Sequence, residues 1–345
     1  MPSPKPTTPR RTPTPSKSAK QSPSAFDKAI DDLRHSPGAF PNISPRWLAG
    51  AAAIAILAAL ACAWLTLCLL FWQGSWQLLY HPTATVTRTP ASAGIPYEPI
   101  KFAATETGTT QLTGWWVPYT PPIHFVQNGS DSFTLAPPAK SSLTVLLLHD
   151  ANGNLSSAVD TIAALHSQHL NVFAIDYRGY GQSLPAKPSE AQLRQDAESA
   201  LSWLTITRNI PAQTILVYGV GLGASLAANL AVEPASVHSK LAGVILDQPS
   251  GEIMAPVFND SRSRLVPVHW LVKDRYDLYA STGALDLPSL WLLPQSRVGN
   301  PSPKTEASDA YTRAHGQKSA AWLKPPIAAD PHLAETLRRW LDDLP

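Results

Sequence analysis

From residue 143 onward, apolar runs typical of buried strands alternate with helix-like segments, and this order limits the fold more than any other feature. The expected strands lie at 143–149, 171–176, 214–218, 241–247 and 289–293. The expected helices lie at 155–169, 189–208, 224–231, 305–315 and 331–343. Strands joined by helices need crossover connections, which make the strands parallel and place helices on both faces of the sheet. The sequence therefore predicts an α/β fold with a mostly parallel central sheet flanked by helices.

Two further strands are expected before this alternation, at 99–104 and 111–119. The stretch 120–141 that follows them is rich in Pro, Gly and Ser. It is longer than most connections inside a domain, so we expect an exposed loop insertion there.

An apolar run without a charged residue spans residues 47–72. Its length of about 25 residues is enough for a helix to cross a bilayer. Basic residues are concentrated before it, at Lys5, Arg10, Arg11, Lys17, Lys20, Lys28, Arg34 and Arg46. The next Lys or Arg after it is Arg88. The positive-inside rule then predicts a single-pass signal anchor, with the N-terminus cytoplasmic and the domain on the far, periplasmic or extracytoplasmic, side of the membrane.

Two other interpretations of this run fit less well. A cleaved signal peptide has a shorter apolar core, and here apolar sequence continues well beyond the stretch 59–62 that resembles a lipoprotein cleavage site. A buried core helix would not be apolar all round with these flanks. We therefore expect a tail at 1–46, a transmembrane helix at 47–72 and an α/β domain at 73–345. Within the tail, the Pro-, Ser- and Thr-rich residues 1–24 are expected to be disordered, and 25–34 to form a short helix.

Composition excludes several classes of function. The formal net charge of +2 is too small to indicate nucleic-acid binding. The only cysteines, Cys62 and Cys68, lie in the apolar run, so the domain can form neither a disulfide nor a cysteine-based metal site. The sequence contains no His-Glu-x-x-His pattern and no phosphate-binding loop with Lys. We expect no metal, no cofactor and no nucleic-acid partner, and we expect the membrane as one partner.

The expected strand at 214–218 leads into Gly219-Val220-Gly221-Leu222-Gly223, and an Ala- and Leu-rich helix follows. A strand, a Gly-x-Ser-x-Gly turn and a helix form the nucleophile elbow of the α/β-hydrolases. Here Gly221 stands in place of the serine. Glycine adopts the positive φ of an elbow freely, whereas other residues are strained there. The substitution therefore removes the nucleophile but suits the turn.

Four other segments extend this resemblance over residues 77–345. They are Gln77-Leu78-Leu79-Tyr80-His81-Pro82, Leu147-Leu148-His149-Asp150-Ala151-Asn152-Gly153-Asn154, Asp176-Tyr177-Arg178-Gly179-Tyr180-Gly181-Gln182-Ser183 and Val272-Lys273-Asp274-Arg275-Tyr276-Asp277. Together they resemble the α/β-hydrolase superfamily, and within it the membrane-anchored serine-aminopeptidase-like branch. The block at 176–183 is the strongest of the four. The resemblance implies an α/β-hydrolase fold, which in active members carries a Ser–Asp–His triad.

The resemblance also implies that all three triad positions are degenerate. The nucleophile position is Gly221, the acid position aligns with Arg297, and the base position aligns with Ala328. His332, four residues after Ala328, is the one nearby histidine that could replace the base. Ser225 lies one turn into the elbow helix, so its hydroxyl is expected to face the packed helix and not a pocket.

The oxyanion hole of such a site uses backbone N–H groups, here expected from Leu222 and Ala151. Asp150 replaces the small glycine that the family carries after the strand-end histidine. Its carboxylate would oppose a developing oxyanion. Capping of the helix after its own loop is an equally good role for Asp150.

The leading hypothesis is a membrane-anchored, catalytically inactive α/β-hydrolase-like protein that binds a small molecule or a protein partner. The residues expected at its pocket are His149, Asp150, Asp176, Tyr177 and His332. One alternative is a divergent hydrolase of esters, thioesters or peptides that uses some of these residues in a rearranged site. Another alternative is an architectural membrane anchor for a complex.

Overall fold

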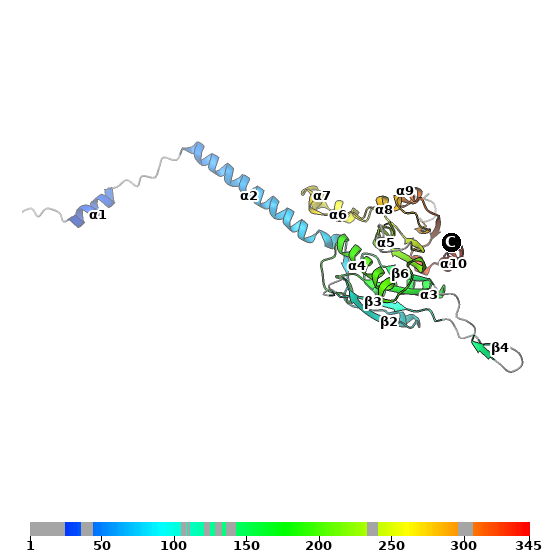
Figure 1. Cartoon of the computed structure of the whole chain (residues 1–345). Coiled ribbons are helices and arrows are strands. Elements are labelled where there is room, and N and C mark those ends of the chain that lie inside the picture. Colours follow the sequence, from blue (N-terminus) through cyan, green and yellow to red (C-terminus); the bar gives the residue numbers. More distant parts are fainter. Residues whose placement is uncertain are drawn as a thin grey trace, which may run out of the picture. The chain divides into compact units, whose positions relative to one another are not determined.

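The computed structural model describes residues 25–35, 44–104, 108, 111–120, 125–127, 133–135, 143–232, 241–295 and 306–345 (Figure 1). The chain divides into two compact units, Met1–Ala63 and Trp64–Pro345. In the first unit, α1 (Ala25–His35) forms where a short helix is expected. The stretch 1–24, expected to be disordered, lies outside the described residues.

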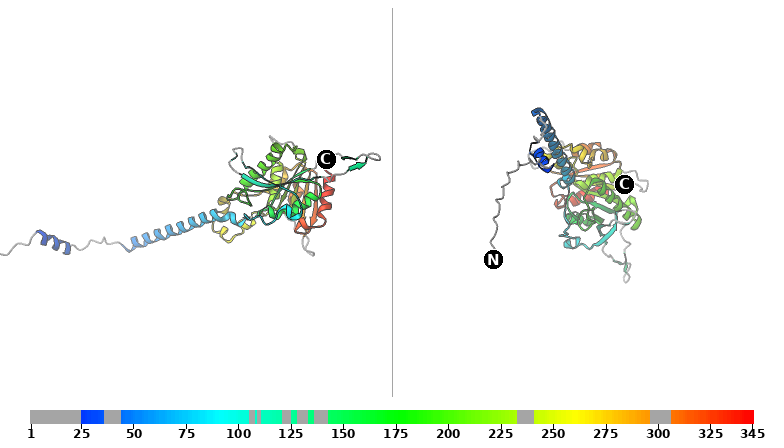
Figure 2. Two further views of the ribbon diagram at one scale, coloured as in Figure 1. Left: turned by 90° about the horizontal axis from the view of Figure 1, so that it is seen from below. Right: turned by 90° about the vertical axis from the view of Figure 1, so that its left-hand side faces the viewer.

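A large central sheet of eight strands organises the second unit (Figures 1 and 2). Its strands are β2 (Glu98–Ala103), β3 (Gln111–Val117), β6 (Thr144–Leu148), β8 (Asn171–Asp176), β9 (Ile215–Val220), β10 (Gly243–Asp247), β11 (Ser289–Pro294) and β12 (Lys318–Leu323). Their order across the sheet is β12-β11-β10-β9-β6-β8-β3-β2. The strands from β12 to β8 are parallel, and β3 and β2 continue the sheet in antiparallel pairing. The predicted α/β fold with a mostly parallel sheet is confirmed.

Helices cover both faces of the sheet, as the crossover connections require. On one face lie α3 (Val159–Ser167) and α10 (Leu333–Asp342). On the other face lie α4 (Glu190–Ser202), α5 (Leu222–Val232), α8 (Leu278–Gly283) and α9 (Glu306–Arg313). A central strand such as β6 is buried along its whole length, which explains why its sequence is a continuous apolar run.

Several elements differ from the sequence prediction. The helix expected at 155–169 begins as the 3₁₀ turn Leu155–Ala158, and the helix expected at 189–208 ends as the π-helical turn Trp203–Thr207. The expected loop 120–141 contains a short hairpin, β4 (Phe125–Gln127) paired with β5 (Phe133–Leu135). Strand β12 was missed because it lies at the sheet edge and is largely accessible, so its sequence lacks a strong apolar pattern.

Smaller elements lie near the ends of the central strands. β1 (His81–Pro82) pairs in parallel with β7 (Asn152–Gly153) in a separate two-stranded sheet. The connection after β10 holds α6 (Ala255–Phe258), the 3₁₀ turn Ser261–Arg264 and α7 (Val268–Leu271).

Helix α2 (Pro45–Gly74) contains the apolar run, and its length and composition are sufficient to span a membrane. Its most apolar window has a mean hydropathy of 2.6. The last turns of α2 belong to the α/β unit because Cys68 and Phe71 are buried in its hydrophobic core. The unit therefore begins at Trp64, upstream of the boundary expected at residue 73.

Phe71→Ala is expected to lower the free energy of unfolding of the α/β unit by about 3–5 kcal/mol, because the phenyl ring is only 3% exposed. The matched control is Leu70→Ala at the preceding position of α2, where the side chain is 63% exposed. Chemical unfolding of the full chain in detergent micelles measures both free energies. Equal losses for the two variants would contradict a core role for the end of α2.

Candidate functional site

The expected elbow lies between β9 and α5. Gly221 has a φ of +56°, a left-handed conformation that costs other residues about 1–3 kcal/mol. Its N–H donates to the carbonyl oxygen of Asp247, at the end of the neighbouring strand β10, over 2.8 Å. Gly223 packs against the end of β6, where a Cβ would clash with the backbone oxygens of Leu148 and His149. The turn keeps the backbone of an elbow and has no side chain at its centre.

The carboxylate of Asp150 fills the space beside Gly221 where a nucleophile would stand. A Cβ added to Gly221 would lie 2.6 Å from Asp150 Cγ and closer still to Oδ1. The same Oδ1 accepts a hydrogen bond from the Leu222 N–H at 2.9 Å. This N–H is the donor that the resemblance assigns to the oxyanion hole. The donor therefore already has an anionic acceptor from within the chain.

Asp150 does not cap the helix after its own loop. The 3₁₀ turn that follows this loop is capped by Asn154, whose Oδ1 accepts from the Ser156 N–H at 2.8 Å. Asp150 instead contacts the first residue of α5, where the positive end of the helix dipole stabilises a carboxylate. Ala151, expected to supply the second oxyanion donor, is buried, and its carbonyl oxygen accepts from the Tyr180 hydroxyl at 2.9 Å.

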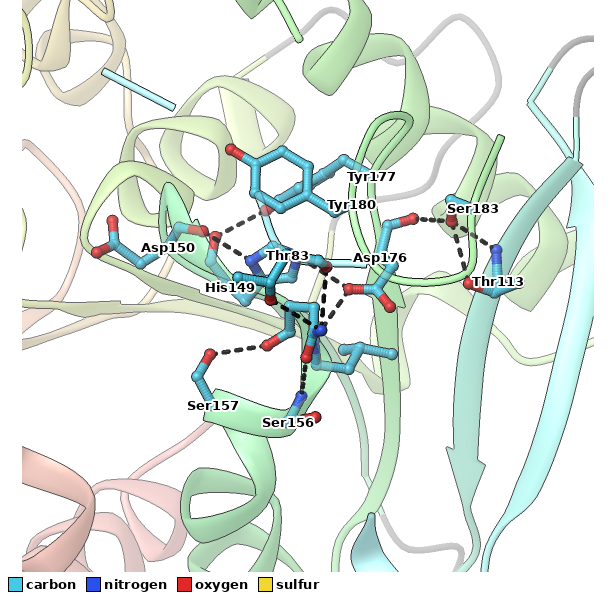
Figure 3. A network of polar contacts seen from close by, with 12 residues as sticks. Thr83, Thr113, His149, Asp150, Ser156, Ser157, Asp176, Tyr177, Tyr180 and Ser183 are labelled. Carbon is cyan, nitrogen blue, oxygen red and sulfur yellow. Dashed lines mark hydrogen bonds and ion pairs between the residues drawn. The ribbon is translucent and has the colours of Figure 1, made fainter. Parts of the chain in front are cut away.

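His149 lies in a buried polar network together with Asp150, Asp176 and Tyr177, as Figure 3 shows. Its side chain is 2% exposed. Nδ1 lies 2.7 Å from the Asp150 carbonyl oxygen, so this nitrogen carries a proton. Nε2 faces the Asp176 carboxylate at 3.4 Å. The rings of Tyr177 and Tyr180 pack against the imidazole with centroid distances of 4.6 and 5.1 Å. An imidazole enclosed in this way cannot reach a substrate without rearrangement of the network.

Asp176 and Tyr177 also hold loops in place (Figure 3). Asp176 is buried, and its Oδ1 accepts from the Leu155 N–H at 2.9 Å. Its carbonyl oxygen accepts from the Ser183 hydroxyl at 2.6 Å. The Tyr177 hydroxyl donates to the His149 carbonyl oxygen at 3.0 Å, and burial raises the pKa of Tyr177 well above its ordinary value. These contacts give both residues a structural role.

The next residue of the same block, Arg178, ties this loop to α4. Its Nε donates to Asp196 Oδ1 at 2.7 Å, and its backbone N–H donates to Asp196 Oδ2 at 2.8 Å. Asp196 is fully buried, so this ion pair is shielded from solvent. The block at 176–183 therefore fixes the loop beside the elbow.

Among the described residues, the remaining expected positions form no triad with Gly221. Arg297 lies outside the described residues. Ala328 lies in the 3₁₀ turn Ile327–Ala329 and has no ionisable side chain. His332 is exposed at the start of α10, which packs on the opposite face of the sheet from α5. Ser225 is fully buried within the packing of α5, as expected.

Asp247 is a residue at the elbow that the sequence analysis misses. The register places it beside Val220, at the ends of β10 and β9. Its carboxylate is buried and accepts a hydrogen bond from the Tyr218 hydroxyl at 2.8 Å. Burial raises the pKa of Asp247 to about 6, the hydrogen bond from Tyr218 opposes this shift, and the nearby Asp150 charge adds to it. Only the order of strands in the sheet reveals this proximity.

Two segments that carry the resemblance meet near the end of α2. The Tyr80 hydroxyl donates to Asp274 Oδ2 at 2.7 Å and lies 2.6 Å from the Tyr276 hydroxyl. The Glu190 carboxylate accepts from the Tyr276 N–H at 3.1 Å and so connects this cluster to α4. Burial raises the pKa of both tyrosines, which keeps their hydroxyls neutral.

A cavity of about 150 Å³ lies against this tyrosine cluster. Its walls include the apolar side chains Trp72, Trp76, Leu79, Met254, Val257 and Leu271. Lys187 and Asp274 add charged groups to the lining. An apolar cavity of about 150 Å³ is large enough for a benzene-sized group.

The arrangement at the elbow offers no nucleophile at Gly221, and its oxyanion donor is occupied. Among the described residues, no group of three or more His, Cys, Asp and Glu side chains is placed to hold a metal ion. The strand order and the elbow nevertheless define a domain of the α/β-hydrolase type.

Comparison with known proteins agrees with this class. The family model described as serine aminopeptidase, S33, matches residues 139–295. An uncharacterized protein of Mycobacterium tuberculosis (strain ATCC 25618 / H37Rv) is 33% identical over 162 residues, which are 47% of this chain and 50% of that protein. The uncharacterized protein YfhR of Escherichia coli (strain K12) is 27% identical over 126 residues, 36% of this chain and 38% of that protein. The chain thus spans about half the length, or less, of these relatives.

Solved structures share the fold. An esterase of Pyrococcus furiosus, Pf2001, superimposes with a TM-score of 0.52 at 18% identity over 77% of this chain and 97% of that chain. An alpha-beta hydrolase of Vibrio vulnificus gives a TM-score of 0.51 at 18% identity over 74% of this chain and 81% of that chain. The partial family match and the shared fold support the α/β-hydrolase fold that the sequence motifs predict.

Asp247→Asn is expected to flatten the dependence of unfolding free energy on pH. A pKa of about 6 in the folded state lies above the ordinary value of about 4 for an Asp carboxyl, so the stabilisation from this group is complete below pH 4 and is lost as the pH rises through 6. Two pKa units correspond to about 3 kcal/mol. Thermal unfolding of wild type and Asp247→Asn between pH 4 and 7.5 measures the difference.

Tyr218→Phe is the matched control for this measurement. It removes the hydrogen bond that favours the charged carboxylate, so the loss of stability should move to higher pH. If the unfolding free energies of all three proteins changed with pH in the same way, this would contradict a raised pKa of Asp247.

Proposed function

We propose that this chain is a membrane-tethered α/β-hydrolase-like protein that has lost serine-triad hydrolysis and acts as a binding domain. The observation that carries the proposal is the Asp150 carboxylate on the Leu222 N–H, in the space beside Gly221. A catalytic elbow needs a nucleophile and a free oxyanion donor at this point. This elbow provides neither.

The electrostatics reinforce this conclusion. Loss of one oxyanion donor typically costs a hydrolase about 3–4 kcal/mol of transition-state stabilisation. Here the donor is lost to a negative charge, which would also repel an oxyanion that forms next to it. Asp247 places a second carboxylate beside the elbow. The local charge is therefore the opposite of what acyl transfer requires.

A rearranged hydrolytic site that uses His149 is disfavoured by the contacts of this residue. Its two ring nitrogens face the Asp150 carbonyl oxygen and the Asp176 carboxylate. Two tyrosine rings cover the imidazole, and its side chain is buried. The cavity of about 150 Å³, whose walls are mostly apolar, supports binding of an apolar group in place of turnover.

The length and composition of helix α2 support the proposed membrane anchor. Thirty residues of helix span about 45 Å, more than the hydrocarbon thickness of about 30 Å. Between Pro45 and Gly74 the helix contains a single charged residue, Arg46. The concentration of basic residues before α2 favours a cytoplasmic N-terminus.

A fluorophosphonate serine-hydrolase probe is expected to leave the purified full chain unlabelled. Gly221→Ser should also remain unlabelled and should not hydrolyse a generic ester above background, because Ala328 offers no base and Asp150 holds the oxyanion donor. Labelling of the wild type that a single serine substitution abolishes would refute the proposal. Ester turnover by Gly221→Ser would show that another residue serves as the base.

The contact between residues 150 and 221 can be tested by a double-mutant cycle on stability. Gly221→Ser is expected to destabilise the unit by about 2–4 kcal/mol, through backbone strain at φ +56° and displacement of the Asp150 carboxylate. In the Asp150→Gly background there is no carboxylate to displace. Gly221→Ser should therefore lower the free energy of unfolding by at least about 1 kcal/mol less than it does in the wild type. Chemical unfolding of the four proteins measures this coupling, and strict additivity would contradict the geometry.

A further inference from the structure

A short segment of the α/β unit lies against the side of α2. This segment, here called the collar, comprises residues 261–271 and contains the 3₁₀ turn Ser261–Arg264 and α7. The indole Nε1 of Trp64 on α2 donates to the Leu265 carbonyl oxygen over 2.9 Å. In Figure 2 the collar, in yellow, lies beside the cyan end of the helix.

This hydrogen bond fixes the level of the collar along the helix. Trp64 lies ten residues before Gly74, so the collar reaches about 15 Å back along α2 from its end. From Trp47, the first residue of the uncharged run, to Trp64 the helix rises only about 26 Å. This is shorter than the hydrocarbon thickness of about 30 Å. A bilayer that contains the uncharged part of α2 therefore extends to the level of the collar.

The collar presents large apolar side chains to solvent. Trp270 is 87% exposed and Leu265 is 62% exposed. The neighbouring Val266 and Val268 are buried and fasten the collar to the α/β unit. The backbone is held as well, since Arg275 donates to the His269 carbonyl oxygen at 2.8 Å. The exposed side chains are thus displayed by a fixed segment.

The apolar surface continues from the collar onto α2. On the helix, Leu65 and Leu69 are exposed at the same level or close to it. In the proposed anchor these helix residues face lipid, because they belong to the uncharged run. The exposed basic side chains of Arg264 and Lys273 flank Trp270 in the sequence, and basic side chains at a bilayer surface are attracted to anionic lipid head groups. Tryptophan itself is favoured at the boundary between acyl chains and head groups.

We propose that the collar is a membrane-inserting surface, with Trp270 and Leu265 in the interfacial layer of the leaflet that α2 leaves. The occupant of this apolar surface is phospholipid. The proposal rests on the membrane anchor proposed above. It adds a second point of membrane contact, which fixes how the α/β unit is oriented on the bilayer.

The test uses spin labels on single cysteines in the full chain, in a Cys62→Ala, Cys68→Ala background reconstituted into phosphatidylcholine–phosphatidylglycerol vesicles. Trp270→Cys reports on the collar, Leu57→Cys on the middle of α2, and Ile206→Cys on an exposed apolar residue outside the collar. Power saturation measures the accessibility of each label to oxygen, which enters lipid, and to a water-soluble nickel chelate. For interfacial insertion, the oxygen-to-nickel ratio at 270 should exceed that at 206 by at least about threefold and lie below that at 57.

Each other outcome would overturn the proposal. If the label at 270 is accessible to the nickel chelate while the label at 57 is accessible to oxygen, membrane insertion of the collar is refuted and the anchor is retained. Low accessibility to both reagents at 270 would show that protein, such as a second copy of the chain, covers the surface. If the label at 57 is accessible to the nickel chelate, both the membrane anchor and the membrane insertion of the collar are refuted.

Discussion

The hydrogen bond from the Leu222 N–H to the Asp150 carboxylate joins the ends of β6 and β9, two adjacent strands at the centre of the sheet. It is charge-assisted and lies at the positive end of the α5 dipole, so two effects stabilise it. The carboxylate needs the room that a glycine leaves at position 221. Gly221 and Asp150 are therefore complementary. Either residue alone would weaken an active elbow, and together they allow the Asp150 carboxylate to bind the Leu222 N–H beside Gly221.

The resemblance to hydrolases persists because the motifs that carry it are mostly structural. Asp176 accepts from the backbone of Leu155, Tyr177 donates to the backbone of His149, and Arg178 pairs with the buried Asp196. Each interaction fixes a loop beside the elbow and none needs a substrate. Removal of such a side chain would leave a buried partner without a hydrogen bond, which costs about 1–3 kcal/mol. Such a cost is independent of catalysis, so these motifs would also be retained in the inactive domain that we propose.

The sequence predicts the central strands well because burial on both faces requires continuous apolar runs. β8 begins and ends at the expected residues for this reason. β12 could not be predicted in the same way, since an edge strand needs no such pattern. At the site, Gly221 and Asp150 are visible in the sequence, but their contact is not, because it depends on the pairing of β6 with β9. Asp247 reaches the elbow only through the pairing of β9 with β10.

The end of α2 is built into the α/β unit rather than joined to it by a linker. Phe71 lies in the core, and the Lys187 ammonium donates to the carbonyl oxygen of Gln73 at 3.0 Å, which satisfies one of the acceptors at the helix end. Shortly after the helix, Tyr80 is fixed by Asp274 and Tyr276. A flexible linker would let the unit sample many orientations at the bilayer. The last turns of α2 lie in the core of the α/β unit itself, so no such linker separates them from it. In the membrane-tethered binding domain that we propose, a fixed orientation would raise the effective concentration of any ligand or partner held in the same membrane, and this gain requires no catalytic residue.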